Sequence, residues 1–177
     1  LGKKNEAQKF IEKQLSSTKE EQSLALSVAK VFWQTGQYQK AIELIKNKNF
    51  TSIIDKIEKL NIIAASQLRL KNKQEAINAY DEILKLTPKD ITTFTKKILT
   101  MEQLGLLQEI LSDLTEFRKM LSPDDPRINL LHAEYLTHMD QAEESMKILS
   151  SYKNTQIESN VIYKGIFGRA LYKLNKF

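Results

Sequence analysis

The sequence predicts an all-α protein, built as an array of antiparallel helix hairpins. Helix breakers are rare, with 5 glycines and 3 prolines among 177 residues. The region around Gly36 has the pattern of a helix that ends at a glycine turn and is followed by a second helix. One face of that second helix carries apolar residues at helical spacing, namely Tyr38, Ala41, Ile42 and Ile45.

This hairpin pattern recurs along the chain. Small or apolar residues follow Ala41 at intervals of 35, 34 and 32 residues, namely Ala76, Ile110 and Ala142. Towards the N-terminus, Gly2 and Ala7 have the same spacing as Gly36 and Ala41. A period near 34 residues is typical of α-helical repeat arrays, in which each hairpin buries one face against its neighbours.

These hairpins resemble tetratricopeptide repeats. Pro88, twelve residues after Ala76, stands where that family has its closing proline, whereas Lys71 and Thr137 replace the turn glycine. The resemblance implies a right-handed superhelical array of antiparallel helix pairs, an α-solenoid. We expect one array over residues 1–177: a second helix at 1–15, repeats at 20–48, 52–88 and 90–121, a divergent repeat at 125–152, and a first helix at 158–177. Because it begins and ends inside repeats, the chain is expected to be part of a larger repeat protein or complex.

The apolar spacing also predicts the individual helices. Asp125 is expected to cap a helix that Pro126 opens, and the segment 152–155 is expected to be a polar connection. The predicted helices span residues 4–15, 20–35, 37–46, 53–70, 74–86, 91–103, 106–121, 128–137, 141–150 and 158–174.

Composition and charge favour a protein with a solvated surface. The 27 basic and 22 acidic residues give a net charge of +5 and are interspersed, so a nucleic-acid partner is not favoured. The chain has no cysteine, which excludes disulfides and thiolate metal sites, and no apolar run long enough for a membrane span. The compartment stays open: the cytoplasm is the first expectation, and a periplasmic or membrane-associated location would follow from a signal in the full chain.

No constellation of catalytic residues is found. His132 and His138 are the only histidines, and six residues along a helix place them about 120° apart, so they do not chelate one metal ion. Asp124 and Asp125 are interpreted as a turn and a helix cap. The sequence therefore predicts no enzyme activity, no cofactor and no metal.

The resemblance further implies that the first helix of each hairpin lines a concave groove. Groove-facing positions are counted back from the turn residues Gly36, Lys71, Gly105 and Thr137. The candidate partner-binding residues are Leu26, Lys30, Trp33, Asn61, Ala65, Leu68, Arg69, Thr95, Leu99, Glu102, Arg127 and Leu131. Trp33 is the preferred site residue, and the alternative is that it packs against the adjacent hairpin.

Three functions are compatible with these residues. The first is a non-catalytic scaffold that binds a peptide or helical segment of another protein in the groove. The second is self-assembly into a homo-oligomer through the open ends of the array, and the third is RNA binding by a helical repeat. Leu26 and Lys30 do not match the residues with which chaperone-binding relatives hold a terminal carboxylate, so that mode is not expected.

Overall fold

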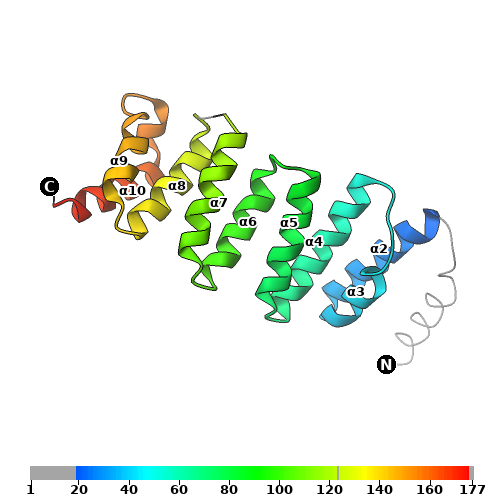
Figure 1. The fold of residues 1–177 in the computed structure, drawn as a ribbon. Helices are drawn as coiled ribbons and strands as arrows, with labels where there is room; N and C mark the ends of the chain where they lie inside the picture. Colours follow the sequence, from blue (N-terminus) through cyan, green and yellow to red (C-terminus); the bar gives the residue numbers. More distant parts are fainter. Residues whose placement is uncertain (1–18, 123, 176–177) are drawn as a thin grey trace. The chain divides into compact units, whose positions relative to one another are not determined.

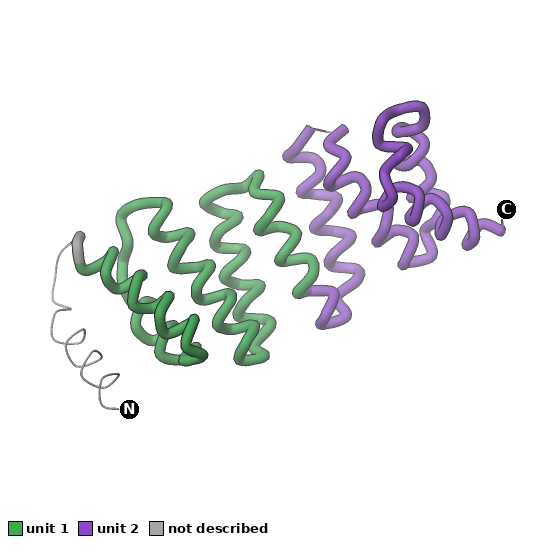
Figure 2. Tube along the Cα trace, turned by 180° about the vertical axis from the view of Figure 1, so that it is seen from behind, with its two compact units in different colours: residues 1–100 green, residues 101–177 purple. Residues whose placement is uncertain are grey.

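The computed structural model describes residues 19–122 and 124–175. Every regular element in these ranges is a helix, which confirms the all-α prediction. The predicted helix 4–15, and the terminal segment 1–15 to which it belongs, lie outside the described residues. Contacts divide the chain into two compact units, Leu1–Thr100 and Met101–Phe177 (Figure 2).

The helices agree closely with those expected (Figure 1). The first unit contains α2 (Lys19–Gln34), α3 (Tyr38–Ile45), α4 (Ile53–Arg69) and α5 (Lys73–Leu86). Helix α6 (Ile91–Glu102) crosses the division between the units. The second unit continues with α7 (Leu107–Met120), α8 (Pro126–His138), α9 (Ala142–Ser150), the 3-10 helix η1 (Gln156–Ser159) and α10 (Val161–Lys173).

The segment before α10 differs from the expectation. It was predicted as a polar connection followed by a helix from residue 158, but η1 intervenes and α10 begins at Val161. Asn160 caps α10, because its side chain accepts a hydrogen bond from the Ile162 amide at 2.8 Å. Tyr152 in the connection is buried, and its hydroxyl accepts from Asn129 Nδ2 at 2.6 Å. An aromatic side chain with an internal partner for its hydroxyl therefore replaces the expected solvated link.

Four turns share one backbone geometry. The turn residues have positive φ angles of 77°, 65°, 76° and 60°, and they are Gly36, Lys71, Gly105 and Asp140. After each of them, the next amide donates to a carbonyl of the preceding helix, as Gln37 N does to Phe32 O at 2.8 Å and Gln141 N to Leu136 O at 2.8 Å. This is the Schellman pattern that closes a helix.

The fourth turn corrects the predicted register. Thr137 is not a turn residue: it is fully buried within α8, and its hydroxyl donates to Ala133 O at 2.8 Å. With the turn at Asp140, the four turns are 35, 34 and 35 residues apart. The apparent shortening of the last repeat was an error that came from aligning Ala142 with Ile110.

The residue five positions after each turn lies where the two helices of a hairpin cross. All four are completely buried, namely Ala41, Ala76, Ile110 and Ser145. Ser145 therefore takes the place that was assigned to Ala142. Its hydroxyl donates to Ala133 O at 2.8 Å and accepts from Thr137 Oγ1 at 2.8 Å, which makes a small polar residue acceptable in the core.

Two apolar clusters stabilise the first unit. The first lies among α2, α3 and α4, and its buried members are Ala25, Leu26, Ala29, Ala41, Ile45, Phe50 and Ile62. The second joins α4 and α5, with Leu60, Ala64, Ala76, Ala79, Tyr80 and Ile83. Ile63 packs against both clusters, so α4 belongs to two layers of core at once. Such sharing is how repeat hairpins form a continuous core.

Lys59 of α4 ties this helix to the connection that precedes it. Its ammonium donates to Lys46 O at 2.7 Å and to Lys48 O at 3.0 Å, and it lies 5.9 Å from the centre of the Phe50 ring. Burial lowers the pKa of Lys59, while the charge of Glu82 raises it. The two carbonyl groups and the aromatic face compensate the ammonium for the water it has lost.

Candidate functional site

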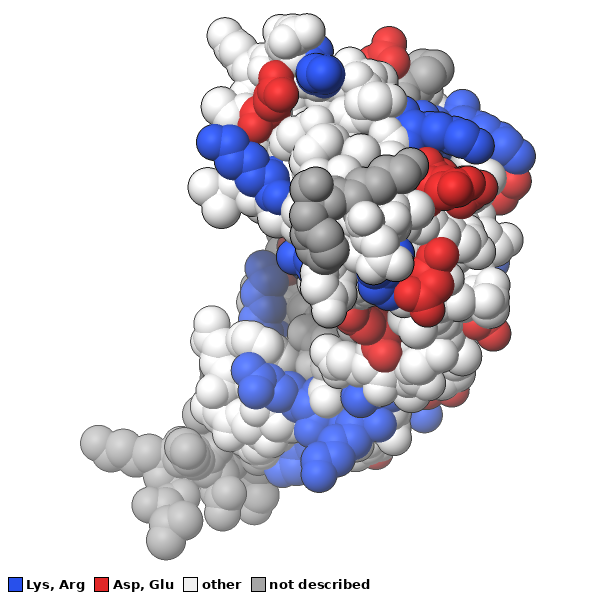
Figure 3. All heavy atoms as spheres, turned by 90° about the vertical axis from the view of Figure 1, so that its left-hand side faces the viewer, with Lys and Arg blue, Asp and Glu red and all other residues white. Residues whose placement is uncertain are grey.

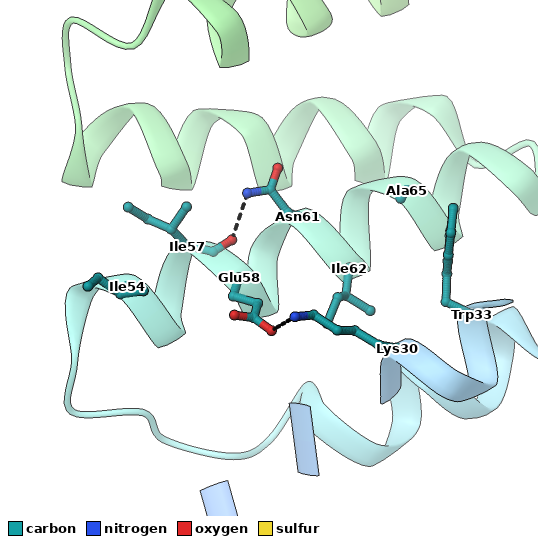
Figure 4. A pocket seen from close by; sticks show the side chains of 8 residues that line it. All are labelled: Lys30, Trp33, Ile54, Ile57, Glu58, Asn61, Ile62 and Ala65. Carbon is teal, nitrogen blue, oxygen red and sulfur yellow. Dashed lines mark hydrogen bonds and ion pairs between the residues drawn. The ribbon is translucent and has the colours of Figure 1, made fainter. Parts of the chain in front are cut away.

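A pocket of about 430 Å³ opens on the surface shared by α2 and α4. Lys30 and Trp33 contribute from α2, and the remaining lining residues come from α4: Ile54, Ile57, Glu58, Asn61, Ile62 and Ala65 (Figure 4). The α4 residues are separated by three or one positions, so they form one stripe along the helix. Most of the side chains that line it are apolar, with charged and amide groups among them.

Trp33 both packs and lines the pocket. Its ring rests partly buried against the α2–α3–α4 cluster, and in Figure 4 it projects from α2 towards the part of α4 that carries Ala65. Its indole Nε1 is buried and has no hydrogen-bond partner among the described residues. A buried donor without a partner costs about 1–3 kcal/mol of stability.

The polar side chains of the pocket are partly occupied. Lys30 Nζ and Glu58 Oε1 form an ion pair of 2.5 Å that bridges α2 and α4, with side chains 53% and 31% exposed. A pair this exposed adds little stability and breaks at low cost when a charged ligand approaches. Asn61 Nδ2 donates to Ile57 O at 3.0 Å within α4, which fixes its side-chain amide in the stripe.

The structure brings four of the predicted groove residues together in this pocket: Lys30, Trp33, Asn61 and Ala65. Leu26 is different, because it is only 3% exposed and packs in the core. Helix α4 contributes Ile62 to the same cluster, which leaves Leu26 no surface for a partner. Its assignment as a contact residue was wrong.

The remaining candidates of the first unit are not among the lining residues. Leu68 is half-buried and packs against the α4–α5 cluster, while Arg69 is exposed at the end of α4. On α6, Thr95 is half-buried and Leu99 is 48% exposed. Their role in partner binding stays a prediction, because none of them lines the α2–α4 pocket.

Three predicted groove residues belong to the second unit. Two of them form hydrogen bonds within the chain, and the third was counted from the wrong turn residue. The Arg127 guanidinium donates to Asp125, the cap of α8, at 2.7 and 3.1 Å, and this hydrogen bonding holds the pKa of Asp125 below its usual value. Glu102 is exposed and forms a hydrogen bond with Tyr135, whose pKa is raised chiefly by burial. Leu131 was counted back from Thr137, and it is half-buried on α8.

Three isoleucines of the pocket were missed by the sequence analysis: Ile54, Ile57 and Ile62. Ile54 is 74% exposed, although isoleucine is usually buried. The sequence did contain a signal for them: α4 carries apolar residues on two sides, whereas a helix that packs through one face needs them on one side only. One side packs against α5, and the other forms the pocket with α2.

The described residues show a mixed distribution of charge on one face and no cluster of metal ligands. The face in Figure 3 carries both signs, with Asp and Glu side chains among the Lys and Arg side chains. No three His, Asp or Glu side chains within the described ranges are placed to hold a metal ion. None of the helices in these ranges has the length and apolar character needed to cross a membrane.

Comparison with known proteins gives a family match and several similar folds. A family model described as anaphase-promoting complex, cyclosome, subunit 3 matches residues 2–83. No curated protein shows a significant match to the sequence.

Three solved structures resemble the chain. The TPR2B-domain:pHsp70 complex of yeast Sti1 is 15% identical with a TM-score of 0.53, covering 67% of this chain and 98% of that one. A tetratricopeptide repeat protein from Parabacteroides merdae is 17% identical with a TM-score of 0.59, covering 88% and 60%. A double mutant of MamA from RS-1 is 16% identical with a TM-score of 0.56, covering 88% and 91%.

At this identity the solved structures establish the fold alone. That fold, the turns every 34 or 35 residues and the family match agree with one another. The chain therefore has the helical repeat fold of tetratricopeptide repeat proteins.

Proposed function

We propose that this protein is a non-catalytic scaffold, and that the α2–α4 pocket binds a peptide or helical segment of a partner protein. The observation that carries the proposal is the pocket itself, which is about 430 Å³ in volume and lined mainly by apolar side chains. Its volume falls within the range of about 300–1,000 Å³ that is usual for ligand pockets. An apolar anchor of the partner would enter beside Ile54 and Ile57.

The polar groups of the pocket define the rest of the ligand. Lys30 and Glu58 stand beside the apolar floor, where opposite charges on the partner would replace their own exposed pair. The expected ligand is therefore an apolar-anchored segment with charged residues on either side of the anchor.

Ile54 offers the sharpest test of this proposal. Random linear peptides displayed on phage would be selected on the protein, and the selected peptides titrated while the emission of Trp33, the only tryptophan, is recorded. Ile54→Ser should weaken binding by about tenfold, because burying an exposed isoleucine contributes about 1.5–3 kcal/mol at most. Its melting temperature should stay near that of the parent, since Ile54 is 74% exposed.

Ile162→Ser is the matched control, because Ile162 is 60% exposed on α10 and lies in the other unit. It should leave peptide affinity unchanged. Peptides that bind both variants and the parent equally, without changing the Trp33 emission, would show that the pocket is not the docking site.

Self-association is a second candidate that one observation favours. Val161 and Ile162 at the start of α10 are 83% and 60% exposed, and adjacent exposed apolar residues are often covered in an assembly. Light scattering over a range of protein concentrations decides this: a mass that rises with concentration, and that Val161→Ser together with Ile162→Ser restores to the monomer, supports assembly. A constant monomer mass excludes it.

A further inference from the structure

A second pocket, of about 240 Å³, lies within the second unit between α7 and α8. Thr115, Arg118 and Lys119 line it from α7, and His132 lines it from α8. The three α7 residues are spaced at i, i+3 and i+4, so they share one face of that helix. The pocket is independent of the α2–α4 pocket and does not rest on the function proposed for it.

His132 is the unusual member of this set. Its side chain is 8% exposed, and its Nδ1 atom is buried with no hydrogen-bond partner among the described residues. Burial, followed by the charge of Arg118, lowers the pKa of His132 from 6.5 to about 4. The imidazole is therefore neutral at neutral pH, with one ring nitrogen that donates a hydrogen bond and one that accepts.

The other lining groups make the pocket positive. Arg118 is half-buried and Lys119 is exposed, and both are cationic. Lys119 also forms an ion pair with Glu116 at 2.7 Å, but both side chains are 67% exposed, so this pair is weak and exchanges readily. The Thr115 hydroxyl donates to Leu111 O at 2.8 Å, so it supplies shape rather than a free donor.

We propose that this pocket binds a phosphate group, which accepts hydrogen bonds from the His132 imidazole N–H, the Arg118 guanidinium and the Lys119 ammonium. Three donors from two helices match the three free oxygens of a phosphate monoester better than the two oxygens of a carboxylate. Two cations balance a dianion. The bound phosphate also offsets the positive charge that Arg118 places beside the imidazole.

The two histidines provide a built-in readout. Because His138 is the only other histidine and is exposed at the end of α8, proton–carbon NMR of the imidazole groups resolves site and control in one sample. Titration with inorganic phosphate at constant ionic strength should shift the His132 signals along a saturable curve and leave the His138 signals in place. Shifts that are equal at both residues, or that do not saturate, would overturn the proposal.

Two variants and two further ligands complete the test. Arg118→Gln removes a charged donor worth about 1.5–3 kcal/mol and should weaken phosphate binding about ten- to hundredfold. Lys164→Gln removes the same charge from the exposed face of α10 and should change the affinity less than twofold. Equal weakening by both variants would mean that phosphate responds only to the net charge of the protein, and it would contradict a specific site in this pocket.

Two further ligands, acetate and N-acetyl-phosphoserine amide, test whether the pocket prefers phosphate to carboxylate and whether the phosphate is free or attached to another molecule. Acetate should bind more weakly than phosphate, and acetate binding as tight as phosphate would refute the assignment. Tighter binding of the phosphoserine compound assigns the pocket to a phosphorylated ligand, whereas tighter binding of inorganic phosphate assigns it to the free ion. Either of these two results supports the proposal.

Discussion

The hairpins α2–α3 and α8–α9 have the same turn geometry but bury different kinds of side chain. In residues 21–45 of the first, the buried side chains are all apolar, from Ala25 to Ile45. The second buries Asn129, His132, Thr137 and Ser145. Thr137 and Ser145 are hydrogen-bonded to each other and to Ala133 O, all at 2.8 Å. The same backbone is therefore compatible with a core of apolar side chains alone and with a core that also contains hydrogen-bonded polar side chains.

The difference matters because the two cores tolerate different changes. An apolar crossing is sensitive to volume, whereas a polar crossing is sensitive to volume and to the loss of hydrogen-bond partners. A buried histidine adds sensitivity to acid, which the all-apolar buried core of residues 21–45 does not have. Substitution at the crossing position and exposure to acid separate the two hairpins on these properties.

The largest effect is expected from leucine at the crossing position. Ala41→Leu should lower the free energy of unfolding by about 1–3 kcal/mol, because the completely buried site has no room for the added carbons. Ser145→Leu should cost more, since it also removes two hydrogen bonds worth about 0.5–1.5 kcal/mol each. Urea unfolding followed by circular dichroism measures both.

The control for these variants is Ser112→Leu on the exposed face of α7. It should change the unfolding free energy by less than about 0.5 kcal/mol. An Ala41→Leu protein as stable as its parent would mean that the helices do not cross at this residue.

Acid should destabilise the second hairpin through His132. The pKa is about 4 in the folded chain and 6.5 as its ordinary value, so the unfolded chain binds the proton more tightly. Stability is therefore complete above pH 6.5 and is lost as the pH falls from 6.5 to 4, by about 2 kcal/mol at pH 5. Urea unfolding in phosphate-free buffer at pH 7 and pH 5 measures the loss.

His132→Gln should flatten this pH dependence, whereas His138→Gln, at an exposed position, should retain it. If the parent and His132→Gln lose the same stability between pH 7 and pH 5, the acid sensitivity comes from other groups.

The smallest effect concerns the turn residues. Lys71 has a φ of 65°, a conformation that glycine adopts without the cost other residues bear. Lys71→Gly should raise the unfolding free energy by about 0.5–1 kcal/mol. Gly36→Ala, at a φ of 77° with nothing within 4 Å of an added Cβ, should lower it by a similar amount. Thermal unfolding of the pair tests this, and a shift of the same sign in both variants would contradict it.

The sequence predicted the helices well because apolar spacing and caps are local properties. The turns at Gly36, Lys71 and Gly105 followed from the period, even where lysine replaced glycine. The predicted register of α8–α9 was wrong because serine, and not alanine, occupies the crossing position. Ser145 serves the same purpose only through partners on α8, and a pairwise contact of this kind has no signature in one sequence.

The candidate site was predictable only in part. Positions counted from a turn located Lys30, Trp33, Asn61 and Ala65, because a helix fixes which residues share a face. They misplaced Leu26, since whether a residue on that face is open depends on how closely the next helix packs. The unsatisfied nitrogen atoms of Trp33 and His132 depend on neighbours in three dimensions and had no sequence signal.

The contact made by Lys59 has a consequence for how the first unit opens. Its ammonium donates to the carbonyl groups of Lys46 and Lys48, so the loop before α4 cannot separate from α4 without breaking both hydrogen bonds. Local fraying of that loop is therefore coupled to the loss of a helix belonging to both apolar clusters. In hydrogen exchange, the amides of α3 and α4 should open as one cooperative segment rather than loop first and helix later.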